Sequence, residues 1–292
     1  MGKKVLVTGA TGKIGSLLVP KLKAAGAEVR ALVRSTEKGK AAKEEGAEIV
    51  LGDFDQPDTL KAAVQGVDTL VLITPPGPEA DRQSQTCIQT AKDAGVKNVV
   101  RISAIIPDER LPTDNTRQHA ETDELLKASG LSFTILRPHA FMQNIFASSG
   151  SIAQDGKMYW GMGDGKMGMI DVRDIADVAA KVVMEEGHDG AIYSLTGPES
   201  ISFHDVAREL SEALDREILY LPIAPEAVES NMKQMGAGDW MSKAIKDYSE
   251  AYASGWGDFV TEDVEKVLGR KPRSIREFIQ EVLVPSLRMA AS

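Results

Sequence analysis

The sequence Lys-Val-Leu-Val-Thr-Gly-Ala-Thr-Gly-Lys-Ile-Gly at residues 4–15 joins a short apolar run to three closely spaced glycines. The run Val5–Val7 has the β-branched bias of a buried strand, and apolar residues at helical spacing follow the last glycine. Strand, glycine turn and helix are the context in which the spacing Gly-x-x-Gly-x-x-Gly indicates a phosphate-binding turn. The stretch therefore predicts the first strand and first helix of a parallel sheet.

Each glycine of this motif has a physical task. Gly9 lets the chain turn off the strand, Gly12 lets a diphosphate approach the backbone, and Gly15 lets the helix pack closely. Free N–H groups and the positive dipole end at the helix start then favour phosphate. We therefore interpret the turn as a dinucleotide site rather than a plain tight turn. The candidate contacts are Gly9, Thr11, Gly12, Lys13, Ile14 and Gly15.

The first half of the chain continues with the alternating strands and helices that are typical of a doubly wound parallel α/β sheet. Glycines just beyond the helix ends mark the expected C-caps. The expected strands are residues 5–7, 28–33, 48–51, 68–73, 98–102, 133–136 and 191–195. The expected helices are residues 14–25, 37–45, a segment after Pro57, 79–94 and 116–128.

The regular alternation of strands and helices ends after Pro138. We expect a short helix over 141–149, a loop over 150–168, and a helix that ends near Met184. Asp171 is the expected N-cap of that helix, with Asp174 in a box-like position three residues on. From Phe203 the pattern is mostly helical, with a short strand at 218–221, and it predicts a smaller region over the carboxyl edge of the sheet.

Composition excludes several classes of protein. The net charge is −9, from 34 basic and 43 acidic residues, which argues against nucleic acid or an anionic membrane as partner. The single cysteine, Cys87, rules out an intramolecular disulfide and is consistent with a cytoplasmic protein. No signal peptide is expected, because the chain enters its first strand at once. The four histidines are dispersed, so we expect no metal site.

The end of the second predicted strand indicates which dinucleotide binds. A carboxylate near this point binds the ribose 2′-hydroxyl in NAD-selective proteins, but here Arg34 stands there. A guanidinium can hold a 2′-phosphate through paired hydrogen bonds, and Lys38 and Lys13 can add positive charge. We therefore favour NADP(H) over NAD(H), the alternative being an arginine that is simply solvated.

Two further turns follow strands at the same edge. Asp53 and Phe54 either border the adenine or belong to a polar turn in which Asp55 caps the next helix. Thr74 and Pro75 begin a Thr-Pro-Pro-Gly turn, which either approaches the middle of the cofactor or forms a rigid loop.

Several stretches together resemble a known family. The motif at residues 8–15, Arg34, Gly52-Asp53, Leu136-Arg-Pro138 and Asp171-Val-Arg-Asp-Ile-Ala176 are similar to those of NmrA-like atypical short-chain dehydrogenase/reductases. This family includes bacterial NADPH-dependent quinone reductases and triphenylmethane dye reductases. The resemblance implies a Rossmann fold, a preference for NADP and a substrate cleft under the C-terminal helices. We expect an NADP-binding Rossmann domain at 1–150, to which 168–197 returns, and a smaller substrate-binding region at 151–292.

The chain departs from the wider superfamily at its catalytic positions. The helix after the fifth strand lacks the usual Tyr-x-x-x-Lys and carries His119-Ala-Glu-Thr-Asp123 instead, although Ser103 matches the upstream serine. Hydride addition to a ketone creates a basic alkoxide that needs a positioned acid, whereas a quinone or dye spreads the electrons over its own π-system. The departure therefore favours a conjugated acceptor. His119 is the candidate proton donor, or else a helix residue that pairs with Asp123.

The segment after the sixth strand and the C-terminal region contain the candidate residues that line the substrate cleft. By position, we expect Pro138 and His139 to pass the nicotinamide, and Phe141 to lie either in the cleft or in the core. Aromatic and methionine side chains suit flat ligands, although each taken singly fits the core as well. The candidate substrate contacts are Phe141, Asn144, Tyr159, Trp160 and Trp240.

We therefore predict an NADPH-dependent oxidoreductase that transfers hydride to a quinone, a dye or a similar conjugated small molecule. One alternative is a non-catalytic NADP(H) sensor of the NmrA type. Another is a carbonyl or imine reductase with a proton donor other than tyrosine. The sequence does not decide between a homodimer and a monomer.

Overall fold

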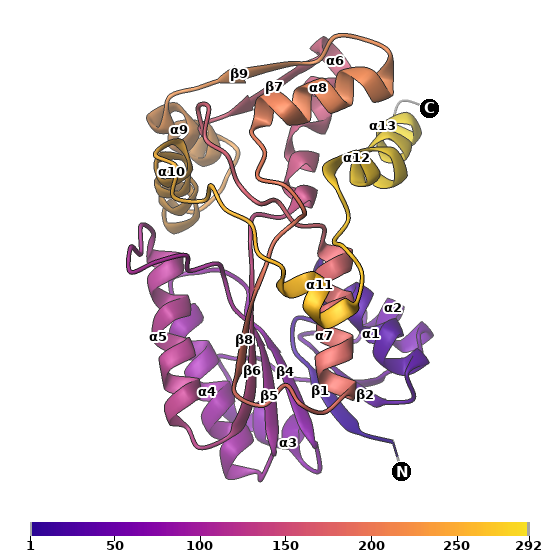
Figure 1. Ribbon diagram of the computed structural model, residues 1–292. Coiled ribbons are helices and arrows are strands. Elements are labelled where there is room, and N and C mark those ends of the chain that lie inside the picture. The colour runs from indigo at the N-terminus through magenta and orange to yellow at the C-terminus, as the bar shows by residue number, and fades with distance from the viewer. Residues whose placement is uncertain (1, 291–292) are drawn as a thin grey trace.

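The computed structural model of the chain describes residues 2–290, and its centre is a seven-stranded parallel sheet (Figure 1). The strand order β3-β2-β1-β4-β5-β6-β8 winds outward in both directions from β1, which confirms the predicted Rossmann-type α/β fold. The strands are β1 (Lys4–Val7), β2 (Glu28–Val33), β3 (Glu48–Leu51), β4 (Thr69–Ile73), β5 (Asn98–Ile102), β6 (Ser132–Pro138) and β8 (Ala191–Leu195).

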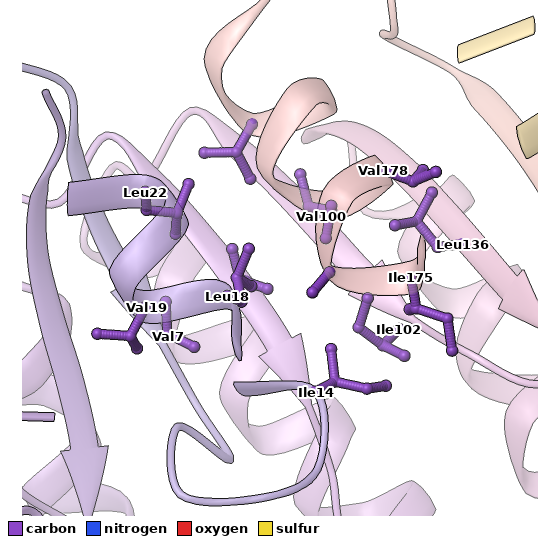
Figure 2. Close-up of a cluster of buried hydrophobic side chains, with 14 of the residues drawn as sticks. Val7, Ile14, Leu18, Val19, Leu22, Val100, Ile102, Leu136, Ile175 and Val178 are labelled. Atoms are coloured by element: carbon purple, nitrogen blue, oxygen red, sulfur yellow. The ribbon is translucent and has the colours of Figure 1, made fainter. Parts of the chain in front are cut away.

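Helices cover both faces of the sheet, because its strands are apolar on both sides. Figure 2 shows one face, where Leu18 and Ile175, from two neighbouring helices, lie in the same buried cluster as Ile102 of the sheet. The helices of this layer are α1 (Gly15–Ala24), α2 (Lys40–Glu44), α7 (Val172–Met184) and α11 (Asp263–Leu268). The opposite layer consists of α3 (Pro57–Val64), α4 (Ala80–Asp93) and α5 (Asp114–Ala128).

A second region lies beyond the carboxyl ends of the strands (Figure 1). It has a hydrophobic cluster of its own and a two-stranded parallel sheet of β7 and β9. Its first elements are η1 (Met142–Ser148), α6 (Ser149–Asp155), β7 (Lys157–Trp160), α8 (Phe203–Leu214) and β9 (Leu219–Pro222). The later ones are α9 (Pro225–Gln234), α10 (Asp239–Ala253), α12 (Ile275–Phe278), η2 (Ile279–Leu283) and α13 (Val284–Ala290).

Three local predictions are wrong. The helix expected from residue 37 begins only at Lys40, because residues 34–39 form a turn whose Gly39 packs against Val33 and Ile49. The loop expected over 150–168 contains most of α6 and all of β7. Asp171 does cap α7 by accepting from the Arg173 N–H, but Asp174 does not complete a capping box. The buried carboxylate of Asp174 instead accepts hydrogen bonds from Arg270 and Arg273 in the C-terminal segment.

Within residues 2–290, none of the helices combines the length and the apolar character needed to cross a bilayer.

Candidate functional site

The glycine turn between β1 and α1 is as tight as its sequence requires. Gly9 adopts a φ of +58°, and its carbonyl accepts the Gly12 N–H at 2.9 Å. A Cβ on Gly15 would lie 2.3 Å from the same carbonyl oxygen, so only glycine fits there. Gly15, which we predicted as a cofactor contact, does not line the cavity described below, and close packing accounts for its place in the motif.

The start of α1 offers unpaired donors. Its N-cap is Ile14, which provides no side-chain cap. The backbone N–H groups of Thr11, Lys13 and Ile14 find no acceptor within the described part of the chain. Unpaired N–H groups at the positive end of a helix dipole are the donors that a diphosphate needs. The turn therefore fits the diphosphate of NAD(P)H.

A cavity of about 710 Å³ runs from this turn to the second region. Its volume is in the upper part of the range of small-molecule sites, roughly 300–1,000 Å³. Most of the predicted site residues line it, namely Gly9, Thr11, Gly12, Lys13, Ile14, Arg34, Lys38, Asp53, Phe54, Thr74, Pro75, Ser103, His119, Pro138, His139, Phe141, Asn144, Trp160 and Trp240. The topology thus brings together, at the carboxyl edge of the sheet, residues that are far apart in the sequence.

One end of the cavity is basic. Arg34 follows β2 directly, Lys38 lies in the turn that replaces the expected helix start, and both side chains are exposed. Neither forms a salt bridge with any residue from 2 to 290, so both remain available to an anion. No carboxylate occupies the end of β2, where a 2′-hydroxyl would need one. This end fits a ribose that carries a 2′-phosphate.

The turn after β3 contains Asp53 and Asp55, whose carboxylates bind different partners. The Asp53 carboxylate accepts the Asp55 N–H at 3.0 Å, which forms a local turn beside the cavity. The Asp55 carboxylate binds Arg82 at 2.6 Å instead of capping α3, whose N-cap is Gln56. The expectation that Asp55 caps the helix is therefore wrong.

His139 borders the cavity, but both of its ring nitrogens form hydrogen bonds with the backbone. Nδ1 accepts the Ala140 N–H at 2.7 Å, and Nε2 lies 3.1 Å from the Gly257 carbonyl oxygen, to which it donates. Burial lowers the pKa of His139 to about 4, although the hydrogen bond to Gly257 opposes the shift. The imidazole therefore joins the end of β6 to the second region and stays neutral.

The middle of the cavity lies over a cluster of charged side chains. Alternation along β5 directs Arg101 and Ser103 to the face that α5 covers, and Arg137 of β6 emerges on that same face. The Asp123 carboxylate of α5 accepts from all three, at 2.8 Å from Arg101, 3.0 Å from Ser103 and 2.9 Å from Arg137. Asp123 is fully buried, and two arginines compensate its charge.

His119 lies one helical turn before Asp123 and lines the cavity. Its Nδ1 is 3.1 Å from an Nη of Arg101 and 3.5 Å from Oγ of Ser103. Part of the ring surface is open, but the surrounding atoms desolvate it and lower its pKa to about 3, helped by the charges of Arg101 and Arg137. Asp123 does not contact the imidazole by hydrogen bond, so the direct pairing we considered is absent.

The far end of the cavity is aromatic. Trp160 lines it, stacks on Phe203 at 5.0 Å between ring centroids, and donates its indole N–H to Ser148 at 3.0 Å. Tyr159 is wrongly predicted, because alternation along β7 turns it to the opposite side from Trp160. It is 41% exposed and does not line the cavity.

Sequence reasoning missed part of this wall. Asn115 lies one turn before His119 on α5 and donates to the hydroxyl of Tyr248 at 2.9 Å, and Tyr252 lies one turn beyond Tyr248. Spacings of four residues, applied to α5 and α10, were the signal that could have found Asn115 and Tyr252. Within residues 2–290, no group of three or more metal-ligating side chains occurs.

Comparison with known proteins agrees with this geometry. The sequence model of the NAD(P)H-binding family matches residues 9–186. The chain is 35% identical over 277 residues to NAD(P)H azoreductase of Xenophilus azovorans, and the match covers 94% of this chain and 96% of that one. It is 28% identical over 283 residues to quinone oxidoreductase 2 of Escherichia coli K12, with 95% and 98% covered.

Solved structures show the same fold. The Escherichia coli NADPH-dependent quinone oxidoreductase complexed with NADPH superimposes with a TM-score of 0.87 at 26% identity, over 96% of this chain and 99% of that chain. NmrA, a negative transcriptional regulator solved with NADP, reaches a TM-score of 0.79 over 100% and 98% of the two chains. At 17% identity, the likeness to NmrA concerns the fold alone.

Proposed function

Since the chain belongs to the NAD(P)H-binding family of NmrA-like atypical short-chain dehydrogenase/reductases, we propose that it uses NADPH to reduce a conjugated small molecule such as a quinone or a dye. The chain is an NAD(P)-binding oxidoreductase of this family. The observation that carries the proposal is the cavity, which joins a phosphate-binding turn to an aromatic wall. Bound NADPH supplies the hydride that the acceptor receives.

The residues of the chain divide the work along the cavity. The unpaired N–H groups at the start of α1 bind the diphosphate, and Arg34 and Lys38 bind the 2′-phosphate. The apolar side chains at the other end hold a flat acceptor and exclude water. We further propose that residues 1–150 with 168–197 hold the cofactor, and that 151–292 provide most of the acceptor site.

The polar groups in the middle of the cavity favour a conjugated acceptor over a ketone. A ketone needs a proton donor when the alkoxide forms. His119 is the nearest candidate, yet burial and two neighbouring arginines keep its pKa low, at about 3. A neutral imidazole is a weak acid at neutral pH, whereas a quinone or dye stabilises the added electrons itself. The alternative of a carbonyl reductase with His119 as the acid therefore has less support.

Turnover with a panel of acceptors tests the proposal. Purified protein is mixed with NADPH and, separately, with a benzoquinone, a naphthoquinone, an azo dye, a triphenylmethane dye and a simple ketone, while NADPH absorbance is followed. We expect oxidation with at least one conjugated acceptor and none with the ketone. A Gly12→Val variant, whose side chain fills the phosphate turn, is the matched inactive control. Absence of turnover with every acceptor, or a preference for the ketone, would contradict the proposal.

The likeness to NmrA keeps a regulatory function as the second candidate, since fold alone does not decide function. A regulator of this kind would bind NADP⁺ and NADPH without turnover and would retain a protein partner. Calorimetric titration with both cofactor forms, followed by affinity capture, separates this candidate from the enzyme. The full-length match to an azoreductase favours the enzyme.

A further inference from the structure

The charged cluster beneath the cavity determines which ring nitrogen of His119 carries its proton. Arginine stays protonated in proteins and has donors but no acceptor. The Nη of Arg101 lies 3.1 Å from Nδ1 of His119, so this nitrogen has to accept and therefore carries no proton. A neutral imidazole with a bare Nδ1 carries its single proton on Nε2.

The neighbouring groups hold Arg101 and Ser103 in this geometry. The hydroxyl of Ser103 donates to Asp123 at 3.0 Å, so its proton is not available to His119. Arg137 and Arg101 both donate to Asp123, which fixes the guanidinium of Arg101 beneath the imidazole. Arg101 is 2% exposed and Asp123 is fully buried, so neither can leave this arrangement without leaving a buried charge unpaired.

The charges that face His119 favour the neutral ring. They are those of Arg101 on β5 and Arg137 on β6, while Asp123 on its own helix is already neutralised by these arginines. Tyr248 of α10 lines the same cavity, and burial raises the pKa of its hydroxyl, so it is uncharged. Two cations and burial thus act against an imidazolium at this position.

The remaining donor of the ring is free. Among residues 2–290, Nε2 of His119 has no hydrogen-bond acceptor, and the residue lines the cavity beside Ser103 and Pro138. Within the described chain, His119 thus has one unpaired N–H and lines the cavity.

We propose that His119 binds the acceptor as a neutral Nε2–H hydrogen-bond donor, and that Arg101 is the positioning residue that fixes this tautomer. The inference rests on the proposed reductase function and deepens it. The heteroatom that receives this hydrogen bond is the carbonyl oxygen of a quinone or a double-bonded nitrogen of a dye. Reduction of a quinone to its hydroquinone consumes one hydride from NADPH and one proton, and this proton comes from water because His119 keeps its own.

Two substitutions at His119 separate a hydrogen-bond donor from an acid. In His119→Gln the side-chain amide can place a neutral N–H near the position of Nε2, whereas His119→Leu offers no donor. Loss of one such donor costs about 100-fold in kcat. We expect that order of loss in His119→Leu and a value within about tenfold of wild type in His119→Gln. An acid would fail in both variants, and that result would overturn the proposal.

The pH profile gives a second readout. A donor that does not titrate leaves kcat/KM for the acceptor flat between pH 5.5 and about pH 8. A fall in kcat/KM over this range that disappears in His119→Gln would show a titrating imidazole, and would overturn the proposal. Tryptophan fluorescence and NADPH titration establish that both variants fold and bind cofactor.

Nitrogen NMR of histidine-labelled protein with NADP⁺ bound tests the tautomer without any turnover. We expect a bare Nδ1 and a protonated Nε2 for His119 at pH 7, with the assignment taken from His119→Gln. In Arg101→Lys, which keeps a charge for Asp123 but loses the second guanidinium nitrogen, we expect a mixture of tautomers. A protonated Nδ1 in the wild type, or a spectrum unchanged in Arg101→Lys, would overturn the assignment. If no acceptor is turned over while the NMR result holds, the reductase function fails and the tautomer assignment stands.

Discussion

The ammonium group of Lys13 lies 3.1 Å from the side-chain oxygen of Asn144 and joins the glycine turn to the segment that follows β6. Both residues line the cavity, so this contact lies at its wall, where the two regions meet. Burial lowers the pKa of Lys13 from its ordinary value, but no carboxylate neutralises it within the described chain. The cation is therefore placed where a diphosphate can use it.

Replacement of Lys13 by methionine should weaken NADPH binding. The change removes the charge but keeps most of the apolar stem. A hydrogen bond to a charged group contributes about 1.5–3 kcal/mol, which corresponds to a Kd roughly 10- to 100-fold higher. Fluorescence titration with NADPH measures it, and Lys40→Met on the exposed side of α2 is the control. An unchanged Kd would show that Lys13 serves only to hold Asn144.

Arg34→Ala should change the choice between the two dinucleotides. Loss of the paired hydrogen bonds to a 2′-phosphate should raise the KM for NADPH by roughly 10- to 100-fold and leave the KM for NADH nearly unchanged. The ratio of kcat/KM values for NADPH and NADH is the measurement. Arg208→Ala, on the exposed face of α8, removes an arginine outside the cavity. Equal losses with both cofactors would contradict the assignment of Arg34.

Gly15→Ala should destabilise the protein. The new Cβ would lie 2.3 Å from the Gly9 carbonyl oxygen and 2.7 Å from Cα of Ala10, so the turn or the helix has to move. Overpacking of this kind costs about 1–3 kcal/mol and should lower the midpoint of thermal unfolding. Gly77→Ala is the matched control, because a Cβ there meets no atom within 4 Å. A similar midpoint in both variants would refute the packing argument.

Stability should fall as the pH falls below about 6.5, the value of a histidine in an unfolded chain. Burial lowers the pKa of His139 to about 4, so between these values the unfolded chain takes up a proton that the folded chain does not. The free energy of unfolding should then decrease by about 1.4 kcal/mol per pH unit from this residue, which is 1% exposed. His119 acts in the same direction, since its pKa is lowered to about 3.

Urea unfolding at pH 7.5, 6.5 and about 5.5 measures this slope. His139→Gln should reduce the slope by the contribution of about one proton, which is about 1.4 kcal/mol per pH unit. An unchanged slope in the variant would exclude His139 as its source.

Asp174→Ala should loosen the C-terminal segment without touching the cavity. The buried carboxylate accepts from Arg270 at 2.8 Å and from the Arg273 N–H at 2.7 Å, which ties residues 270–273 to α7. We expect a loss of about 2–3 kcal/mol in the free energy of unfolding and normal NADPH affinity in the folded protein. Asp164→Ala, which breaks only an exposed pair with His204, should cost less than about 1 kcal/mol. A weakened NADPH affinity would show that the segment also shapes the site.

Much of the cofactor end could be predicted from sequence, because its chemistry is local. Gly9 and Gly12 occupy a turn that the neighbouring strand and helix imply, and Arg34 follows the end of β2 by direct continuation of the chain. The acceptor end of the cavity was harder to predict from sequence. Trp160 and Tyr159 are adjacent in the sequence, and only the packing of β7 against α8, where Trp160 stacks on Phe203, determines which of them reaches the cavity.

The sequence by itself determined the parallel sheet, the glycine turn and the basic residue at the end of β2, since glycine conformation, strand patterning and position along the chain are local properties. Only the tertiary structure decided the protonation state and tautomer of His119. Arg101, Asp123 and Arg137 come from β5, α5 and β6, and they act on the imidazole only because strand register and helix packing bring them together. Burial then makes these contacts strong enough to fix a proton, and burial depends on the whole fold.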